Sequence, residues 1–225
     1  MREARYGLSD LSDQTDRFRN NIWSKKHLTW NFHLADKETM KVTKAAFDLW
    51  TANLSLSFKG VSLNPDILIS FREDLHTNID KKNGEMCPSP LDGPSGVLAH
   101  ASYPTGDKDY VTEVHVDRTE SWHIYISKNP PRTYSLLYVI THEVGHTLGL
   151  HHSKYNGSIM FAKAPSEINF PIILSLDDIL HIRYLCSTNY HSSTTTIPPI
   201  TTTAVVTTTH QKTSITISAL YETLM

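Results

Sequence analysis

The stretch Thr141–Ser153, which reads THEVGHTLGLHHS, constrains this chain more than any other. His142 and His146 are four residues apart, so in a helix both imidazoles project from one face. Gly149 can adopt backbone conformations that are closed to other residues, which lets the helix stop and the chain turn. His152 can then return and complete a site of three nitrogens with one open position, which is the arrangement of catalytic zinc.

Glu143 follows the first histidine directly, where a carboxylate can reach a metal-bound water. A helix that merely happens to carry histidines is the alternative. The longer pattern HExxHxxGxxH fixes five positions at set spacing, however, and rarely arises by chance. The stretch therefore predicts a catalytic metal site with Glu143 as its base.

Length and composition agree with a single enzyme domain. The 225 residues suit one domain of typical size plus a tail, and a hydrophobic content of 39% is enough for a core. The net charge of −2 gives no reason to expect nucleic acid as a partner, and no run of apolar residues is long enough to predict a transmembrane segment.

Two features bear on export. The segment Met1–Tyr6 lacks the apolar region of a signal peptide, so either the protein is not exported by that route or the chain is a processed or truncated form. Cys87 and Cys186 are compatible with one disulfide, with free thiols, or with one cysteine that ligates metal.

The N-terminal half predicts the order strand, helix, strand, strand. Residues 1–22 are polar and are expected to be an extended lead-in, and the alternation in His27–Leu34 predicts a half-buried strand. Asp36 is a plausible N-cap for a helix that reaches about Asn53. The apolar stripe expected on this helix consists of Val42, Ala45, Ala46, Leu49 and Trp50. Short strands are expected at Leu56–Phe58 and Ile67–Phe71, which together predict an α/β sheet covered by the first helix.

Residues 72–96 form a long connection with little periodic pattern. A structureless loop of that length inside a compact domain usually has a function or is pinned. His76 lies within the loop, and His100 and His115 lie in the predicted strands that follow it. These three histidines could share a second zinc ion, although ordinary surface histidines are the alternative.

Acidic residues gather near the same loop. Asp92 precedes Gly93 in a tight turn, and Asp117 and Glu120 follow His115 closely. Carboxylate oxygens combined with backbone carbonyls of a glycine-containing turn suit calcium. Because Asp and Glu are common in loops, the pattern alone is equally compatible with plain surface charge.

The C-terminal half predicts two further helices and a tail. Helices are expected at Tyr134–Leu148 and Leu176–Leu185, and Met160 is either core filler or a hydrophobic floor under the metal ligands. Eleven of the eighteen residues from Ser192 to Thr209 are Ser or Thr, so this part has few groups that can pack. It predicts a disordered stalk or linker, with simple low-complexity drift as the alternative.

The segment His142–Met160 resembles a metzincin, with Met160 at the Met-turn and Ser153 as the residue that matrixins place after the third histidine. Three other segments resemble the matrixin motifs FDGxxGxLAHA, DAHFDxxExW and LSxDDI: Leu91–Ala101, Glu113–Trp122 and Leu174–Ile179. The likeness extends from about residue 18 to 186. The chain thus resembles a matrix metalloproteinase catalytic domain, with a lead-in at 1–17 and a tail at 187–225.

This resemblance implies an α+β fold of the metzincin type. A twisted, mixed five-stranded sheet with three helices is expected, with the catalytic zinc in a cleft between an upper and a smaller lower subdomain. The implied activity is that of a secreted, monomeric zinc metalloendopeptidase, which cleaves internal bonds of extracellular matrix proteins such as collagen. Its partners would be extended protein or peptide substrates.

The resemblance also assigns roles to residues. Catalytic zinc is expected on His142, His146 and His152, with Glu143 as the general base that activates the zinc-bound water. Structural zinc is expected on His76, His100 and His115. Calcium is expected on Asp92, Asp117 and Glu120, with a second ion on Asp66 and, less surely, Glu113.

Substrate recognition follows from the same family pattern. The strand with Leu98, Ala99 and Ala101 would be the edge on which an extended peptide lies antiparallel. Tyr138 stands where the family lines its S1′ pocket. A bulky residue there implies a shallower pocket and a preference for medium apolar side chains such as Leu.

Three departures from the family pattern matter. The family has Asp two residues after the first structural-zinc ligand, but here Asn78 follows His76, so Asp80, Glu85 or Cys87 is expected to supply the fourth ligand. The family's PxY wall is not visible in Phe161–Pro165. The inhibitory PRCG motif and a hemopexin-like domain are absent, which predicts a chain with no internal latch.

Two rival functions are compatible with parts of this pattern. A zinc-binding module could recruit partners through the edge strand and the Thr-rich tail, but a purely structural site needs no free carboxylate such as that of Glu143. A metzincin with another substrate class is the second rival. Ser153 and the sequence Leu98–Ala101 argue against it.

Overall fold

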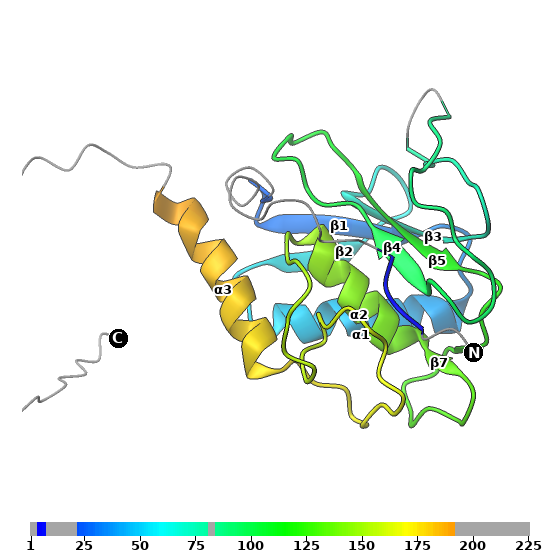
Figure 1. Ribbon diagram of the computed structural model, residues 1–225. Coiled ribbons are helices and arrows are strands. Elements are labelled where there is room, and N and C mark those ends of the chain that lie inside the picture. The colour runs from blue at the N-terminus through cyan, green and yellow to red at the C-terminus, as the bar shows by residue number, and fades with distance from the viewer. Residues whose placement is uncertain (1–3, 8–21, 81–83, 192–225) are drawn as a thin grey trace, which may run out of the picture. The chain divides into compact units, whose positions relative to one another are not determined.

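Five strands form one mixed sheet in the order β2-β1-β3-β5-β4 (Figure 1). The computed structural model describes residues 4–7, 22–80 and 84–191. The strands are β1 (His27–Phe32), β2 (Ser57–Gly60), β3 (Ile67–Arg72), β4 (Ala99–Ala101) and β5 (Thr112–Asp117). All neighbours pair in parallel except β4, which lies antiparallel to β5 at the edge of the sheet. The predicted mixed five-stranded sheet is therefore confirmed.

Helix α1 (Lys37–Thr51) begins where the sequence predicts. The Asp36 side chain accepts a hydrogen bond from the Thr39 N–H at 2.7 Å, as an N-cap does. Val42, Ala46 and Trp50 are buried as expected, whereas Ala45 and Leu49 are only partly buried. The stripe also contains Phe47, which the sequence reasoning left out.

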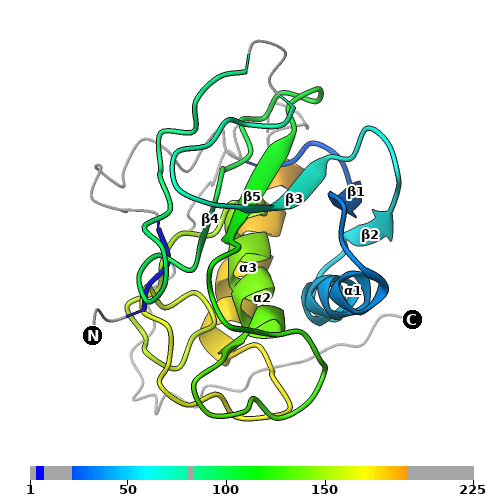
Figure 2. The ribbon, with the colours of Figure 1, turned by 90° about the vertical axis from the view of Figure 1, so that its right-hand side faces the viewer.

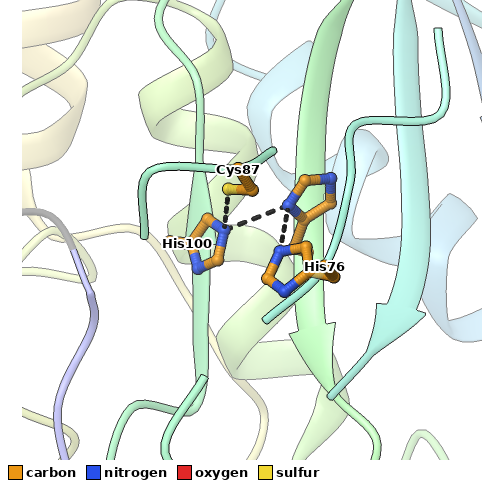
Figure 3. A group of neighbouring side chains, drawn as sticks. His76, Cys87 and His100 are labelled. Carbon is orange, nitrogen blue, oxygen red and sulfur yellow. Dashed lines mark hydrogen bonds between the residues drawn. The ribbon is translucent and has the colours of Figure 1, made fainter. Parts of the chain in front are cut away.

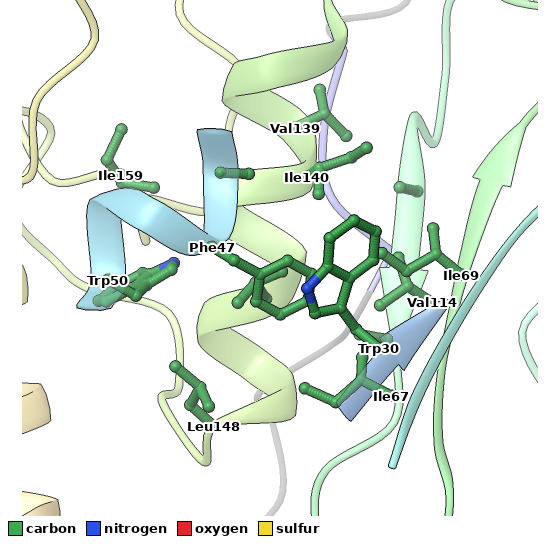
Figure 4. Packing of buried hydrophobic residues seen from close by; sticks show 14 of the residues in the cluster. Trp30, Phe47, Trp50, Ile67, Ile69, Val114, Val139, Ile140, Leu148 and Ile159 are labelled. Atoms are coloured by element: carbon green, nitrogen blue, oxygen red, sulfur yellow. The ribbon is translucent and has the colours of Figure 1, made fainter. Parts of the chain in front are cut away.

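The main core lies between the sheet and the two helices α1 and α2, which both pack under it (Figure 2). Trp30 of β1 stacks on Phe47 of α1 with ring centroids 5.0 Å apart. Figure 4 shows this pair between side chains of the sheet, such as Ile69, and of α2, such as Ile140. The sheet therefore gives α2 a rigid support.

Helix α2 (Leu136–Thr147) is shorter than the predicted range of 134–148. Tyr134 and Ser135 form strand β7, which pairs with β6 (Trp122–His123), and Ser135 is the N-cap of the helix. Every residue of α2 except Tyr138 is buried. The indole N–H of Trp50 donates to the Thr141 carbonyl at 2.9 Å, which locks α2 against α1.

Helix α3 (Leu176–His191) is longer than the predicted Leu176–Leu185 and extends past residue 187, where the tail was expected to begin. Its Asp178 carboxylate accepts hydrogen bonds from Ser158 Oγ, the Ile159 N–H and the Ser175 N–H. Because Ile159 precedes the predicted Met-turn residue, this contact ties α3 to the region below α2. The Ser/Thr-rich stretch from 192 onward lies outside the described residues, and the predicted lead-in is described only at 4–7 and from 22.

None of the helices within the described residues is both long and apolar enough to cross a membrane.

Candidate active site

Three imidazoles converge at the C-terminal part of α2. The Nε2 atoms of His142 and His146 lie 3.1 Å apart, and those of His146 and His152 lie 3.2 Å apart. On the opposite ring edges, Nδ1 of His142 lies 2.6 Å from the Ile159 carbonyl and Nδ1 of His146 lies 2.7 Å from the Leu150 carbonyl. A carbonyl only accepts hydrogen bonds, so each Nδ1 carries a proton and each Nε2 of these two rings presents a lone pair.

Lone pairs that face one another at this distance repel unless a cation lies between them. The arrangement leaves His142, His146 and His152 as a compact set of three ligand atoms. Two carbonyls hold the rings in the required tautomer, as neighbours of metal-ligating histidines usually do. The residues present thus fit a zinc ion with one open coordination position.

The turn after α2 brings the third imidazole back. Gly149 has φ +103°, a conformation that side chains of L-residues rarely adopt, and this is the role expected for it. The Leu150 N–H donates to the Gly145 carbonyl and the Gly149 N–H to the His146 carbonyl, which closes the end of the helix. The chain then reaches His152 and continues beside Met160, because the Ser153 N–H donates to the Met160 carbonyl.

Glu143 is fully buried beside these histidines. Neither of its carboxylate oxygens has a hydrogen-bond partner among the described residues. Burial raises the pKa of this carboxyl group well above its ordinary value. A buried carboxylate without a structural partner, next to a metal-type site, is typical of an acid–base catalyst.

Met160 lies directly under the histidine helix. A Cβ added to Gly145 would collide with the Met160 sulfur atom, so the two residues are in close contact. Met160 is buried, as expected of either a core residue or a floor under the metal ligands.

A second group of ligand atoms lies next to β4 and β5, which contain His100 and His115 (Figure 3). His76 Nε2 lies 2.9 Å from His115 Nδ1, and His100 Nε2 lies 3.0 Å from the same atom. Cys87 Sγ lies 3.2 Å from His100 Nε2. Three imidazole nitrogens and one sulfur atom within this space match a closed, four-coordinate zinc site.

The fourth member of this group is Cys87, one of the three candidates Asp80, Glu85 and Cys87. The Cys87 N–H donates to the His76 carbonyl at 2.8 Å, which turns the thiol toward the imidazoles. The Asp80 N–H donates instead to Glu113 Oε1 at 3.0 Å, and the Asp80 carboxylate is not part of the group. Cys87 therefore connects the loop to the imidazoles of β4 and β5.

The electrostatics of the second group suit a metal. Burial lowers the pKa of His76, and burial followed by the neighbouring imidazoles lowers the pKa of His100 to about 3, so both rings are neutral. Burial raises the pKa of the Cys87 thiol, which favours the protonated form, and binding of a metal to this sulfur would displace the proton. No disulfide involves Cys87, which is a free cysteine.

Glu113 was expected to bind calcium together with Asp66, and its carboxylate contacts the second histidine group. Its carboxylate accepts hydrogen bonds from His115 Nε2 and the Ile79 N–H, both at 2.9 Å. Burial opposes ionisation, but these donors and the Asp80 N–H lower the pKa of Glu113 overall. By holding the proton of His115 on Nε2, Glu113 leaves Nδ1 as the ligand atom.

Asp92, Asp117 and Glu120 gather around the turn at Gly93. Asp92 Oδ1 accepts from the Val97 N–H at 2.6 Å, and Glu120 Oε1 accepts from the Ser95 N–H at 2.7 Å. Burial first, and then the negative charges of Asp117 and Asp92, raises the pKa of Glu120. Asp117 Oδ2 is buried without a partner among the described residues. A bound cation such as calcium would relieve the electrostatic repulsion between these carboxylates.

Asp66, the other expected calcium ligand, has partners of its own. Its Oδ1 lies 2.5 Å from Lys25 Nζ, and its Oδ2 accepts from the N–H and the O–H of Thr29, both at 2.8 Å. The carboxylate thereby joins the segment before β1 to the start of β3.

Strand β4 is the edge strand of the sheet, and its expected role in substrate binding stays a prediction. Leu98, Ala99 and Ala101 are buried there. A pocket of about 510 Å³ opens beside His152, which follows α2, and is lined by His152, Ser153, Met160, Asp177, His181 and Tyr184. Tyr138 is half-buried and its hydroxyl donates to the Ser158 carbonyl at 3.5 Å, so its role in a substrate pocket stays a prediction.

The sequence reasoning missed Tyr6, whose ring stacks on His142 with centroids 3.6 Å apart. The segment Ala4–Gly7 lies between β4 and residues 162–164, to which its backbone is hydrogen-bonded. The available signal was Arg5-Tyr6-Gly7, which matches the Arg and the Gly of PRCG with Tyr in place of Cys.

Comparison with known proteins agrees with this geometry. The family model described as Matrixin, of Peptidase M10, matches residues 22–187. The chain is 31% identical to neutrophil collagenase of Homo sapiens over 185 residues and 35% identical to interstitial collagenase of Sus scrofa over 187 residues; each match covers 80% of this chain and 36% of the collagenase. It is 30% identical to matrilysin of Felis catus over 191 residues, which cover 82% of this chain and 67% of matrilysin.

The chain therefore spans about a third of the length of the collagenases that it matches. The matched region contains β1 to β7, α1 and α2, and with them both histidine groups. The chain belongs to the matrixin family.

Proposed function

We propose that this protein is a zinc-dependent metalloendopeptidase that cleaves internal peptide bonds of extracellular matrix proteins, acting as a monomer outside the cell. The observation that carries the proposal is the convergence of three Nε2 atoms beside Glu143, a buried carboxylate without a partner among the described residues. A structural metal site would need neither an open position nor that carboxylate.

His142, His146 and His152 would hold the catalytic zinc. When bound, zinc supplies Lewis-acid activation of both the attacking water and the scissile carbonyl. Glu143 accepts the proton of the attacking water and then delivers it to the leaving amine. The raised pKa of Glu143 makes it a stronger base than an ordinary carboxylate, which favours the first of these transfers.

The substrate would lie along β4 as an added strand. Backbone N–H and C=O groups at the edge of β4 that faces away from β5 would bind the peptide backbone, which gives affinity independent of side chains. Side-chain preference would come from a pocket on the primed side, with Tyr138 limiting its depth. We expect medium apolar side chains such as Leu at P1′.

Further cations would stabilise the fold. The group His76, Cys87, His100 and His115 would hold a structural zinc ion. Calcium on Asp92, Asp117 and Glu120 would relieve the repulsion that raises the pKa of Glu120. The carboxylates of Asp66 and Glu113 already accept hydrogen bonds from Lys25, Thr29 and His115, so a second calcium ion would have to displace these donors.

The test is cleavage of a quenched fluorescent peptide with Leu at P1′, with and without a zinc chelator. The assay includes the variant Gly7→Ala, because residues 4–7 lie along β4 and could mask turnover in the wild type. Turnover that the chelator abolishes and added zinc restores is expected. A folded, zinc-loaded Gly7→Ala variant that binds this peptide without cleaving it would contradict the proposal.

A further inference from the structure

We propose that Asn156 carries an N-linked glycan, attached at the tip of the turn that connects His152 to Met160. The proposal rests on the proposed function, because N-linked glycans are added to chains that enter the secretory pathway, as a protein that acts outside the cell does. The glycan would shield from proteolysis a connection on which the catalytic site depends.

The sequence contains two acceptor patterns of the form Asn-x-Ser/Thr in which x is not Pro. Asn53–Ser55 follows α1 and reads NLS, whereas Asn156–Ser158 follows the histidine motif and reads NGS. A pattern of three residues is common by chance, so the surroundings of each asparagine in the folded protein decide between them. The sugar replaces one hydrogen of the side-chain Nδ2 atom, and this atom must therefore reach solvent in the native fold.

Asn156 stands at the exposed tip of a tight turn. The Ser158 N–H donates to the Tyr155 carbonyl at 3.0 Å, so Asn156 and Gly157 are the two central residues of this turn. Both residues are exposed, and the Asn156 side chain makes no hydrogen bond with other residues that the structure describes. A glycan on its Nδ2 atom would thus displace no hydrogen bond of the folded domain.

Gly157 shapes the space beside the acceptor. A Cβ on this residue would lie 2.8 Å from the Cε1, Cζ and hydroxyl oxygen atoms of Tyr155, so the tyrosine ring packs closely against the bare glycine. The Tyr155 side chain is nevertheless 55% exposed. It offers an aromatic surface at the same turn, on which the C–H groups of a pyranose ring can pack. The inner sugar would therefore find support on the protein.

Ser158 completes the acceptor pattern and is then needed by the fold. Its hydroxyl donates to the Asp178 carboxylate and accepts from the Met160 N–H at 2.9 Å, and the residue is fully buried. N-linked glycans are transferred to the chain before it folds, so the burial of Ser158 does not hinder the transfer. The native fold has to accommodate only the sugar on Asn156, which is exposed.

Asn53 is the less suitable acceptor. Its Nδ2 atom donates to the Leu49 carbonyl at 3.2 Å, and its backbone carbonyl accepts from Arg183 Nε at 3.3 Å. The Leu49 carbonyl is one of the last four of α1, and such carbonyls depend on partners outside the helix ladder. Asn53 is also half-buried. A glycan there would compete with a contact that closes the helix, so the fold favours Asn156.

The turn that carries Asn156 is exposed to proteases at its tip. The Ser153 N–H donates to the Met160 carbonyl at 2.8 Å, which closes the loop, whereas Lys154 and Tyr155 are exposed. Exposed loop tips are preferred sites of proteolytic cleavage. A cut after Tyr155 would separate the third catalytic histidine from Met160. A bulky glycan on the next residue would block the approach of a protease to this bond.

The experiment compares wild type with Asn156→Gln and the matched control Asn53→Gln. Each protein is produced with a secretory signal sequence in cells that add N-linked glycans. Mass spectrometry of peptides, before and after treatment with an N-glycosidase, measures the occupancy of each asparagine. Each folded protein is then exposed to dilute chymotrypsin, and the rate of the cut after Tyr155 is followed. Turnover of the quenched peptide is measured in the same samples.

We expect a glycan on Asn156 in about half or more of the wild-type molecules, and a cut after Tyr155 that is about tenfold faster in Asn156→Gln than in wild type and Asn53→Gln. An unmodified Asn156 in folded, secreted wild type would overturn the glycan site, whether or not Asn53 is modified. Equal rates of cutting in all three proteins would overturn the shielding. An occupied Asn156 without peptide turnover would support the glycan site and contradict the protease, and turnover with an unmodified Asn156 would do the reverse.

Discussion

At the scale of single residues, the chemistry depends on which nitrogen of each imidazole carries a proton. The carbonyls of Ile159 and Leu150 select one tautomer of His142 and His146, and Glu113 selects the other tautomer of His115. His142 and His146 thus present Nε2 to the catalytic group, and His115 presents Nδ1 to the second group. The ligand sets are prepared before any metal arrives, which lowers the cost of binding.

Glu143 is the residue whose replacement should separate catalysis from folding. We expect Glu143→Ala to lower kcat/KM by about 10²-fold or more, because the proton transfer loses its base. Zinc content should stay unchanged, since Glu143 is not one of the converging ligands. The measurement is peptide turnover with metal analysis, in the Gly7→Ala background. Full activity in the double variant would remove Glu143 from the mechanism.

Asp66 should make stability depend on pH. Burial opposes its ionisation, but Lys25 and Thr29 lower its pKa below the ordinary value. A carboxyl group with a lowered pKa in the folded state contributes stability above its unfolded pKa of about 3.9, and this contribution is lost as the pH falls through the folded pKa.

The corresponding variant is Asp66→Asn. We expect a lower Tm than wild type at pH 7 and a difference that shrinks below about pH 4, where the wild-type carboxyl group also becomes neutral. Asp48→Asn is the control, because Asp48 pairs with Lys44 on the exposed surface of α1 and such pairs contribute little. A Tm difference for Asp66→Asn that is the same at pH 7 and pH 3 would contradict this account.

At the scale of elements, α2 is held from several sides. The Trp50 and Trp23 indoles donate to carbonyls of Thr141 and Thr147, the sheet packs above the helix, and Met160 lies below it. Such burial explains why the helix shows little amphipathic pattern and why its boundaries were predicted too widely. What positions the histidines is this packing of α2 against its neighbours.

Gly145 is the point where α2 and the Met-turn region are closest. On an exposed helix, Gly→Ala would stabilise by up to about 1 kcal/mol. Here we expect Gly145→Ala to destabilise by about 1–3 kcal/mol, because the new methyl group collides with Met160 and overpacks the core. Chemical denaturation measures the change.

The control for this prediction is a double-mutant cycle with Met160→Ala. If the collision is the cause, the loss due to Gly145→Ala should be smaller in the Met160→Ala background than in wild type. Equal losses in both backgrounds would show that Met160 is not the obstacle.

At the scale of the whole molecule, the long connection 72–96 is secured by side chains that are far apart in the sequence. His76 and Cys87 come from the loop, whereas His100 and His115 come from β4 and β5. A metal at this point would join the loop to the sheet edge that receives the substrate. Its binding energy would therefore contribute to folding.

Cys87 should decide whether the second metal is retained. We expect Cys87→Ala to contain about one zinc ion per chain where wild type contains about two, because a four-coordinate site loses one ligand. Its Tm should also fall, and a chelator should lower the wild-type Tm toward that of the variant. Metal analysis and thermal unfolding are the measurements.

Cys186→Ala is the matched control, since Cys186 is the other free cysteine and lies on α3, outside both histidine groups. It should keep both zinc ions and most of the thermal stability. Two zinc ions in Cys87→Ala would return the fourth position to Asp80 or Glu85.

The sequence by itself determined the features that depend on local geometry. The spacing of His142, His146 and His152 specifies a three-nitrogen site because a helix and a glycine turn have fixed dimensions. Asp36 marks the start of α1 because capping involves neighbouring residues only. The family motifs are also local, because each lies within one continuous segment, and they predicted the mixed sheet by resemblance.

Only the tertiary structure decided which groups meet across long stretches of chain. It placed Cys87 rather than Asp80 beside the three imidazoles of the second group. It also brought the Glu113 carboxylate to His115 and stacked the Tyr6 ring on His142. Each of these contacts depends on how a loop or a terminal segment returns to the sheet. Spacing along the sequence carries no information about that return, because loop closure is governed by packing and hydrogen bonding at the place where the chain comes back.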